Sequence, residues 1–96
     1  MKGGWVYIMA NRPFGTLYIG VTNDISRRAW EHRQRHGTGF TARYGVVRLV
    51  YMERHEEIAV AIRRETRLKH WPRAWKLDLI EGFNPRWDDL FDDLAG

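Results

Sequence analysis

Two tyrosines near the start of the chain are the first residues whose type and spacing could do chemistry. Tyr7 and Tyr18 each lie in a run of aromatic and β-branched residues, and turn residues separate the runs, so the pattern predicts a β-hairpin. Side chains alternate between the faces of a strand, which puts Tyr18 and Gly20 on one face. With residues 11–14 as the loop, Tyr7 lies directly across from Tyr18, and two phenols meet beside a glycine. Such a pair is either a chemical site or a structural aromatic contact across the strands.

Two basic side chains stand on the helix that is expected next. Asn23 is a suitable N-cap, and the helix should end at about Gln34. Arg28 and His32 lie one turn apart and share an arc with Ile25 on the inward face. An unpaired buried cation is costly, so these two side chains either extend to water from the border of that face or serve a purpose that requires them there.

A single carboxylate interrupts the apolar face of the longer helix expected over residues 56–70. On a helical wheel Glu65 falls near the centre of that face. The apolar positions are Ile58, Ala61, Ile62 and Leu68. A carboxylate on a buried stripe should be paired, protonated or bound to metal. One interpretation is a buried ion pair, for example with Arg28. The other is a ligand for Mg²⁺, which proteins usually hold through one or two carboxylates, water and substrate phosphate.

Strand, turn and helix signals place these residues in an α+β domain. The expected strands cover residues 5–10, 16–22 and 46–53, and a short third helix covers residues 74–81. A loop rich in glycine spans residues 36–45. The order is ββαβαα, which predicts a small three-stranded, mostly antiparallel sheet flanked by helices.

The C-terminal segment, residues 84–96, differs in composition from residues 1–83, which hold the candidate chemistry. Its apolar residues Trp87, Leu90 and Phe91 recur at helical spacing among four aspartates. We expect a capping helix that packs on the same domain. A partner-binding segment and an acidic flap over the basic face are the alternatives.

Charge is distributed unevenly along the chain. Residues 1–80 carry a net charge of +8, and residues 81–96 carry −4. Arginine outnumbers lysine 13 to 3, and the planar guanidinium binds phosphate oxygens in pairs, although codon usage would explain this excess equally well. A basic body with an acidic end indicates a polyanionic partner, most often nucleic acid.

Composition also excludes several classes of protein. The chain has no cysteine, which rules out a disulfide scaffold, a thiolate nucleophile and a zinc–thiolate site, and which suits a reducing cytoplasm. No apolar run approaches the ~20 residues of a membrane span, and the first residues lack the apolar core of an export signal. We therefore expect a cytoplasmic protein with no membrane partner.

Five features together resemble the GIY-YIG endonuclease superfamily. In this sequence they are Trp5-Val6-Tyr7, Tyr18-Ile19-Gly20, Arg28, His32 and Glu65. The resemblance covers the chain from residue 5 to about residue 80, and later features look like the small single-domain bacterial branch of that superfamily. Trp5 and Val6 depart from the glycine and isoleucine of the family's first triplet. Val21 stands where some relatives have a lysine.

The resemblance implies a role for each of these side chains. Glu65 matches the metal-binding glutamate, and Arg28 matches the arginine that contacts the scissile phosphate. Tyr7 matches the favoured general base for the attacking water, Tyr18 matches a tyrosine that positions water or phosphate, and His32 would orient a tyrosine or the phosphate. Which tyrosine takes the proton stays open, since a phenol with a pKa near ~10 needs nearby positive charge to act at neutral pH.

The implied function is hydrolysis of phosphodiester bonds in DNA with one Mg²⁺ or Mn²⁺ ion. We expect low sequence specificity, because no separate DNA-binding domain is evident and a basic surface grips phosphates rather than bases. Selection of branched, flapped or damaged DNA, a role in repair or recombination, and RNA as a further target stay open. The alternative is an accessory nucleic-acid-binding module whose catalysis is weak or depends on a partner protein; no obligate partner is evident. The expected nucleic-acid contacts are Arg27, Arg35, Thr41, Arg43, Tyr44 and Lys69.

Overall fold

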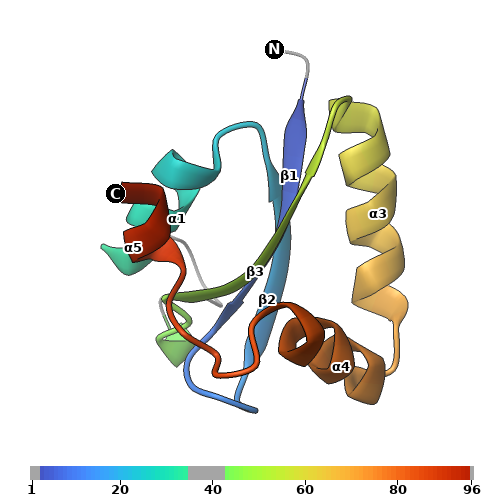
Figure 1. Ribbon diagram of the computed structural model, residues 1–96. Helices are drawn as coiled ribbons and strands as arrows, with labels where there is room; N and C mark the ends of the chain where they lie inside the picture. Colours follow the sequence, from blue (N-terminus) through green and yellow to red (C-terminus); the bar gives the residue numbers. More distant parts are fainter. Residues whose placement is uncertain (1–2, 35–42, 96) are drawn as a thin grey trace.

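The computed structural model describes residues 3–34 and 43–95 of the chain. The elements are β1 (Gly4–Ala10), β2 (Leu17–Thr22), α1 (Ile25–Arg33), β3 (Arg48–His55), α3 (Ile58–His70), α4 (Arg73–Phe83) and α5 (Phe91–Ala95). They follow the predicted order, with the short helix α5 added near the C-terminus (Figure 1). The expected α+β class and the ββαβαα order are therefore confirmed.

The sheet has the strand order β2-β1-β3, and β1 pairs antiparallel with both neighbours. As the central strand, β1 contributes alternate residues to opposite cores. One set, Val6, Ile8 and Ala10, packs with residues of α3 and α4. The other set, Tyr7 and Met9, packs with residues of α1 and of the C-terminal segment. Helix α3 thus covers one face of the sheet, and α1 with α5 covers the other (Figure 1).

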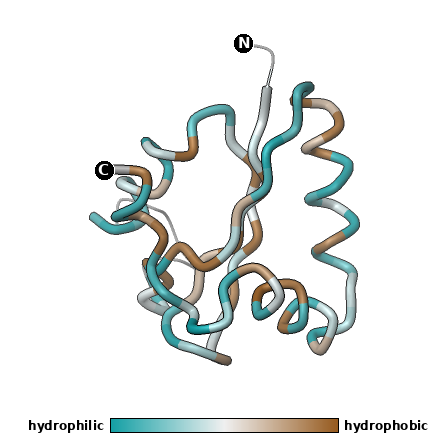
Figure 2. The backbone as a smooth tube through the Cα atoms, in the orientation of Figure 1, coloured by the Kyte–Doolittle hydropathy of each residue, from teal (hydrophilic) through white to brown (hydrophobic). Residues whose placement is uncertain are grey.

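Hydrophilic and hydrophobic positions alternate along α3 (Figure 2). Ala61 and Leu68 are fully buried against the sheet, whereas Ile62 is 47% exposed. The prediction that Ile62 belongs to the buried face is therefore wrong. A sheet of only three strands offers a narrow surface to the helix. Ile62, which directly follows Ala61 in the chain, is already turned toward solvent.

The β1–β2 hairpin has a longer turn than the sequence predicts. Ala10 pairs with Leu17, so Tyr7 lies opposite Gly20 and not opposite Tyr18. The turn extends to Thr16, whose backbone N–H donates to the side-chain oxygen of Asn11 at 2.9 Å. These added turn residues move the register by two positions, which keeps both tyrosines on the same face.

Helix α1 begins one residue later than expected. Asp24, and not Asn23, is the N-cap, and its carboxylate accepts a hydrogen bond of 3.1 Å from the backbone N–H of Arg27. The Asp24 N–H is itself held by the hydroxyl of Thr22 at 3.1 Å. The helix ends at Arg33 with Gln34 as its C-cap, as predicted.

The C-terminal segment crosses β3 before it reaches α1. The Asn84 side chain donates to the carbonyl of Val50 at 3.1 Å, and the Leu90 N–H donates to the carbonyl of Leu49 at 2.8 Å. Trp87 is 1% exposed and completes the core between the sheet and α4. The helix is confined to α5 because the residues before it bind the β3 backbone. Within the described ranges, no helix is both long and apolar enough to span a bilayer.

Candidate active site

Three aromatic rings from three elements form the centre of the candidate site. The ring centroids of Tyr7 and Tyr18 lie 6.3 Å apart, and His32 of α1 lies 5.7 Å from the first and 5.4 Å from the second. The Tyr7 hydroxyl forms a 3.2 Å hydrogen bond with Nε2 of His32. The structure thus brings together the two tyrosines and the histidine that the sequence singles out.

Gly20 allows this arrangement, because the Tyr7 phenol lies directly over it. A Cβ atom at position 20 would be 2.5 Å from the Tyr7 hydroxyl oxygen and 2.6 Å from the carbon that carries it. Neither distance is sterically possible without movement of a fully buried side chain. The strand surface is therefore low at this point, as expected.

Burial raises the pKa of Tyr7 well above the ordinary value of a phenol, and repulsion of a Tyr7 phenolate by an ionised Tyr18 and by the Glu65 carboxylate raises it further. Arg28 acts in the opposite direction, through its charge and through a hydrogen bond to the phenol. The net effect keeps Tyr7 protonated at neutral pH. A proton can leave it only if another group accepts that proton.

His32 is suited to be that acceptor. Its side chain is 5% exposed, and burial lowers the pKa of the imidazole below its ordinary value, with the charge of Arg28 as the second cause. A histidine with a lowered pKa is neutral at pH 7. Its Nε2 atom faces Tyr7, and its buried Nδ1 atom has no hydrogen-bond partner in the described part of the chain.

Arg28 lies beside these rings with its side chain 41% exposed. Its Nε atom is 3.2 Å from the carboxylate of Glu31, which also pairs with Arg27 at 3.3 Å. A polar pocket of about 220 Å³ adjoins both arginines at the start of α1. The guanidinium is therefore accessible from solvent, and Glu31 holds it in place.

Glu65 comes from α3, which packs against β1 and β2, and its charge acts on the Tyr7 phenol. Its side chain is 13% exposed, and its carboxylate lies 2.7 Å from the ammonium of Lys69. The expected alternative of an ion pair with Arg28 is wrong, because Arg28 pairs with Glu31 and Glu65 with the lysine one turn later on its own helix.

The site could accept a divalent ion through one carboxylate. Among the described residues no cluster of three or more His, Cys, Asp or Glu could hold a metal by itself. The Glu65 carboxylate is therefore the donor to consider, and the Lys69 ammonium contacts it at 2.7 Å. Carboxylate oxygen is the ligand that Mg²⁺ and Mn²⁺ prefer, and such ions commonly complete their coordination with water and substrate phosphate. The residues therefore fit an ion that binds together with substrate.

The expected nucleic-acid contacts are only partly described. Arg35 and Thr41 lie outside the described residues. Arg43 stacks its guanidinium over the ring of Tyr44 at 5.7 Å, and the Tyr44 side chain is 47% exposed. Lys69 is half exposed but engaged with Glu65. Arg27 is exposed beside Arg28 and shares its partner Glu31.

One residue that positions the site is absent from the sequence-based prediction. Glu31 restrains both Arg27 and Arg28, and its spacing of four and three residues from them is a standard ion-pair spacing on a helix. The same spacing of four relates Glu65 to Lys69. Attention to pairs at these spacings would have found both contacts.

Comparison with known proteins shows the family of the chain. Residues 3–78 match the model of the GIY-YIG catalytic domain. Two proteins of Staphylococcus aureus (strains Mu3 and N315), both named UPF0213 protein, are 35% identical over 81 residues, which are 84% of this chain and 98% of theirs. A UPF0213 protein of Bacillus halodurans, solved by NMR in solution, is 32% identical with a TM-score of 0.51, and the match covers 82% of this chain and 83% of that one.

Proposed function

The chain belongs to the GIY-YIG nuclease family, and on that premise we propose that it is a metal-dependent endonuclease that hydrolyses phosphodiester bonds in DNA. One observation carries the proposal. Tyr7, Tyr18 and His32 form a single ring cluster, and the charges of Arg28 and Glu65 both act on the Tyr7 phenol. A module that only binds nucleic acid has no need for this convergence.

Arg28 would bind the scissile phosphate. Its guanidinium is accessible, and its planar fork can bind two oxygens of a phosphodiester at once. Binding of this kind would displace Glu31. The fixed positive charge then offsets the negative charge that develops on the phosphorus oxygens in the transition state.

Tyr7 and His32 would remove the proton from the attacking water as a pair. The raised pKa of Tyr7 prevents the phenol from ionising by itself at neutral pH. When Tyr7 takes the water proton, its own proton can pass to the neutral imidazole across the 3.2 Å hydrogen bond. Tyr18 borders both rings and would position the water or the phosphate.

Glu65 would be the side chain that holds a Mg²⁺ or Mn²⁺ ion. When bound, such an ion supplies positive charge for the scissile phosphate and the leaving oxygen. Lys69 must then release the Glu65 carboxylate, and its ammonium becomes available to a phosphate of the same strand.

The enzyme would cut DNA with low sequence specificity. We propose further that it selects DNA by shape, such as branches or flaps, and that it acts in repair or recombination. The net charge of +8 over residues 1–80 supplies affinity for any phosphate backbone. RNA would share this attraction. Binding should accordingly weaken steeply as salt is added.

A second candidate, an accessory nucleic-acid-binding module, has one observation in its favour. Both charged groups of the site are paired within the chain, Arg28 with Glu31 and Glu65 with Lys69. A module whose catalysis depends on a partner would keep its charges paired in this way until the partner released them.

Incubation of the pure protein with branched, nicked and linear DNA in Mg²⁺ or Mn²⁺ tests the proposal. The variants are Glu65→Gln, Arg28→Ala and Tyr7→Phe, each checked for folding by circular dichroism. We expect each to reduce the single-turnover rate by about 10²-fold or more. Glu81→Gln is the matched control, because Glu81 is an exposed carboxylate on α4. Equal cutting by wild type and Glu65→Gln would refute the proposal, and no cutting by any form would favour the accessory module.

A further inference from the structure

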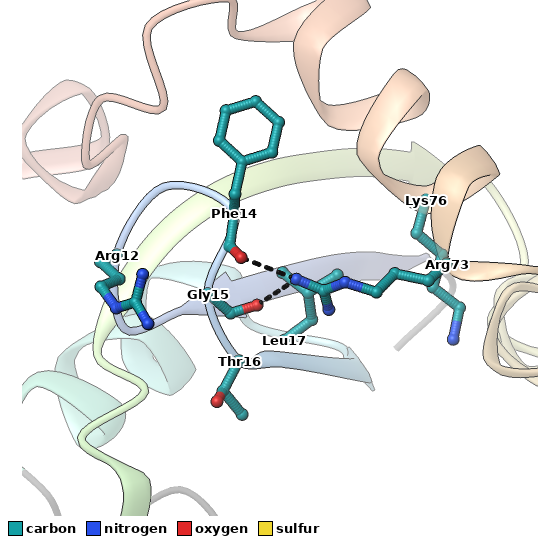
Figure 3. A pocket seen from close by; sticks show the side chains of 7 residues that line it. All are labelled: Arg12, Phe14, Gly15, Thr16, Leu17, Arg73 and Lys76. Atoms are coloured by element: carbon teal, nitrogen blue, oxygen red, sulfur yellow. Dashed lines mark hydrogen bonds between the residues drawn. The ribbon is translucent and has the colours of Figure 1, made fainter.

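A basic groove lies at the turn end of the β1–β2 hairpin. It has a volume of about 520 Å³ and is lined by residues of the turn and by two residues of α4. Three cationic side chains face it: Arg12 from the turn, and Arg73 and Lys76 from α4 (Figure 3). No role in the proposed chemistry has been given to any of the three.

The wall of this groove is fixed in position. The Arg73 guanidinium reaches from α4 to the turn and donates to the carbonyls of Phe14 and Gly15 at 2.8 and 2.7 Å (Figure 3). The Gly15 N–H donates to the Arg12 carbonyl at 3.0 Å. Phe14 has a positive φ of 58°, which is rare for an aromatic residue, and its ring contacts Trp87 at 5.0 Å between centroids. The turn therefore presents its side chains on a rigid frame.

The charge of the groove is uncompensated. No carboxylate of the described residues lines it, and within those ranges none of its three cations forms an ion pair. The Lys76 ammonium donates one hydrogen bond to the carbonyl of Lys69 at 3.1 Å, and it has two further N–H donors. Three cations held within one groove without a counter-charge indicate an anionic ligand.

The groove continues toward the candidate active site. A second pocket, of about 360 Å³, is lined by Leu17, Tyr18, Ile19, Lys69 and Lys76. It shares Leu17 and Lys76 with the first pocket. Its other end includes Tyr18 and Lys69, which belong to the candidate site. The two pockets thus form one track from the ring cluster to the hairpin turn.

We propose that this track binds the phosphodiester backbone of the nucleic-acid strand that extends away from the cleavage site. Lys69 would contact the phosphates next to the scissile bond, and Lys76, Arg12 and the free donors of Arg73 would contact those further along. The inference rests on the proposed nuclease function, and it adds a direction to it: the strand leaves the site along β2 toward the hairpin turn. Such contacts recognise the backbone and carry no sequence preference.

Fluorescence anisotropy with labelled DNA tests this track separately from cleavage. Binding of a 20-base-pair duplex is measured with EDTA present, so that no cutting takes place. The test variant is Arg12→Ala/Lys76→Ala, which leaves the Arg73 contacts with the turn in place. The matched control is Arg54→Ala/Arg63→Ala. Both residues are exposed and line neither pocket, and their substitution removes the same amount of positive charge. Thermal unfolding of both double variants establishes that they are folded.

We expect the groove variant to bind the duplex at least about tenfold more weakly than the control at about 0.1 M salt. The slope of log affinity against log salt should fall by about two for the groove variant, one for each lost phosphate contact. Equal affinities and equal slopes for the two variants would overturn the proposal, since only total charge would then matter. A loss of binding in the groove variant would support the track even if no form of the protein cleaves DNA. Failure of the nuclease proposal can therefore be told apart from failure of the track proposal.

Inorganic phosphate distinguishes a strand from a small anion as the ligand. Calorimetric titration with phosphate alone should show no binding below about 1 mM, because three separated cations need a chain of phosphates to engage them together. Tight binding of free phosphate by the wild type, lost in Arg12→Ala/Lys76→Ala, would overturn the assignment to a strand and indicate a small-anion site.

Discussion

Arg64 of α3 holds Glu53 of β3 through two contacts, Nε to Oε2 at 3.0 Å and Nη2 to Oε1 at 3.3 Å. The next residue of the helix, Glu65, turns to the other edge of the sheet, where its partner Lys69 lines the pocket beside Tyr18. Neighbouring residues of α3 therefore serve opposite edge strands. One side stabilises the fold, and the other side carries the proposed chemistry.

The Glu53 cluster should make stability depend on pH in the acid range. Burial opposes ionisation of Glu53, but hydrogen bonds from Tyr51, Arg64 and His55 outweigh it and lower the pKa of the carboxyl. A lowered pKa means that the stabilisation is present above the unfolded-state pKa and is lost as pH falls through the folded-state value. We expect Glu53→Gln to lower the free energy of unfolding at pH 7 by about 2 kcal/mol. Urea denaturation from pH 7 to pH 3 should show this difference shrink.

The control for that series is Glu56→Gln, which removes an exposed carboxylate next to α3. Its unfolding free energy should differ from that of the wild type by less than about 0.5 kcal/mol at every pH. A difference between Glu53→Gln and wild type that stays constant down to pH 3 would contradict the assigned role of the ionised carboxyl.

The cleavage rate should reach its plateau at a pH below the ordinary pKa of histidine. If Tyr7 passes its proton to His32, the reaction needs a neutral imidazole, and the lowered pKa of His32 makes it neutral already in mildly acid solution. The single-turnover rate should therefore stay level from pH 7 to pH 8 and fall only at pH values below the ordinary pKa of histidine. His32→Ala should slow the reaction and abolish the plateau. A rate that climbs tenfold per pH unit from pH 7 to 9 would instead mean that a phenol titrates directly.

Gly20→Ala should disturb the candidate site at its centre. The added methyl group would lie 2.5 Å from the Tyr7 hydroxyl, so the phenol must move away from its contacts with Tyr18 and His32. We expect a loss of about 1–3 kcal/mol in stability and a fall of cleavage by at least about tenfold. Thermal unfolding and single-turnover kinetics measure the two effects.

Gly82→Ala is a matched glycine substitution, because a Cβ atom at that position of α4 meets nothing within 4 Å. It should raise stability by about 0.5–1 kcal/mol, since alanine favours a helix over glycine, and leave cleavage unchanged. Wild-type activity in Gly20→Ala would contradict the requirement for a phenol lying over β2.

Lys69→Ala should reduce the metal concentration that cleavage requires. The ammonium of Lys69 competes with a divalent ion for the Glu65 carboxylate from 2.7 Å, so its removal favours the ion. We expect the Mn²⁺ concentration at half-maximal rate to fall several-fold, about 1 kcal/mol in binding free energy, while affinity for DNA weakens. Arg67→Ala, an exposed neighbour on α3, is the control. An unchanged metal requirement would refute the competition.

The residues of the site could be predicted from sequence more fully than their contacts. Strand alternation put Tyr7 and Tyr18 on one face, and helical periodicity turned His32 and Glu65 toward the sheet; the structure has both features. The direct pairing of Tyr7 with Tyr18 failed because hairpin register depends on turn length, and the Asn11 to Thr16 contact that closes the turn leaves no periodic signal.

Two further predictions were wrong because the sequence offers two residues that are almost equally suited to the same contact. Asn23 and Asp24 are both good N-caps, and only the path of the chain after Thr22 selects Asp24. The ion pair of Glu65 was predicted correctly in kind but with the wrong partner, since Lys69, one turn later on the same helix, takes the place expected for Arg28. A local pair on a helix requires no tertiary arrangement, so it forms in preference to a pair between separate helices.

The largest fully buried side chain of the described structure, Trp87, lies nine residues beyond the stretch that matches the family model. A fragment trimmed to residues 3–78 would retain every proposed catalytic group, yet it would lack Ile80 and Trp87, which belong to the same buried core as Val50 and Tyr51 of β3. Minimal versions of this domain for transplantation into chimeric enzymes should therefore extend past the tryptophan, since the family boundary and the smallest autonomous folding unit do not coincide.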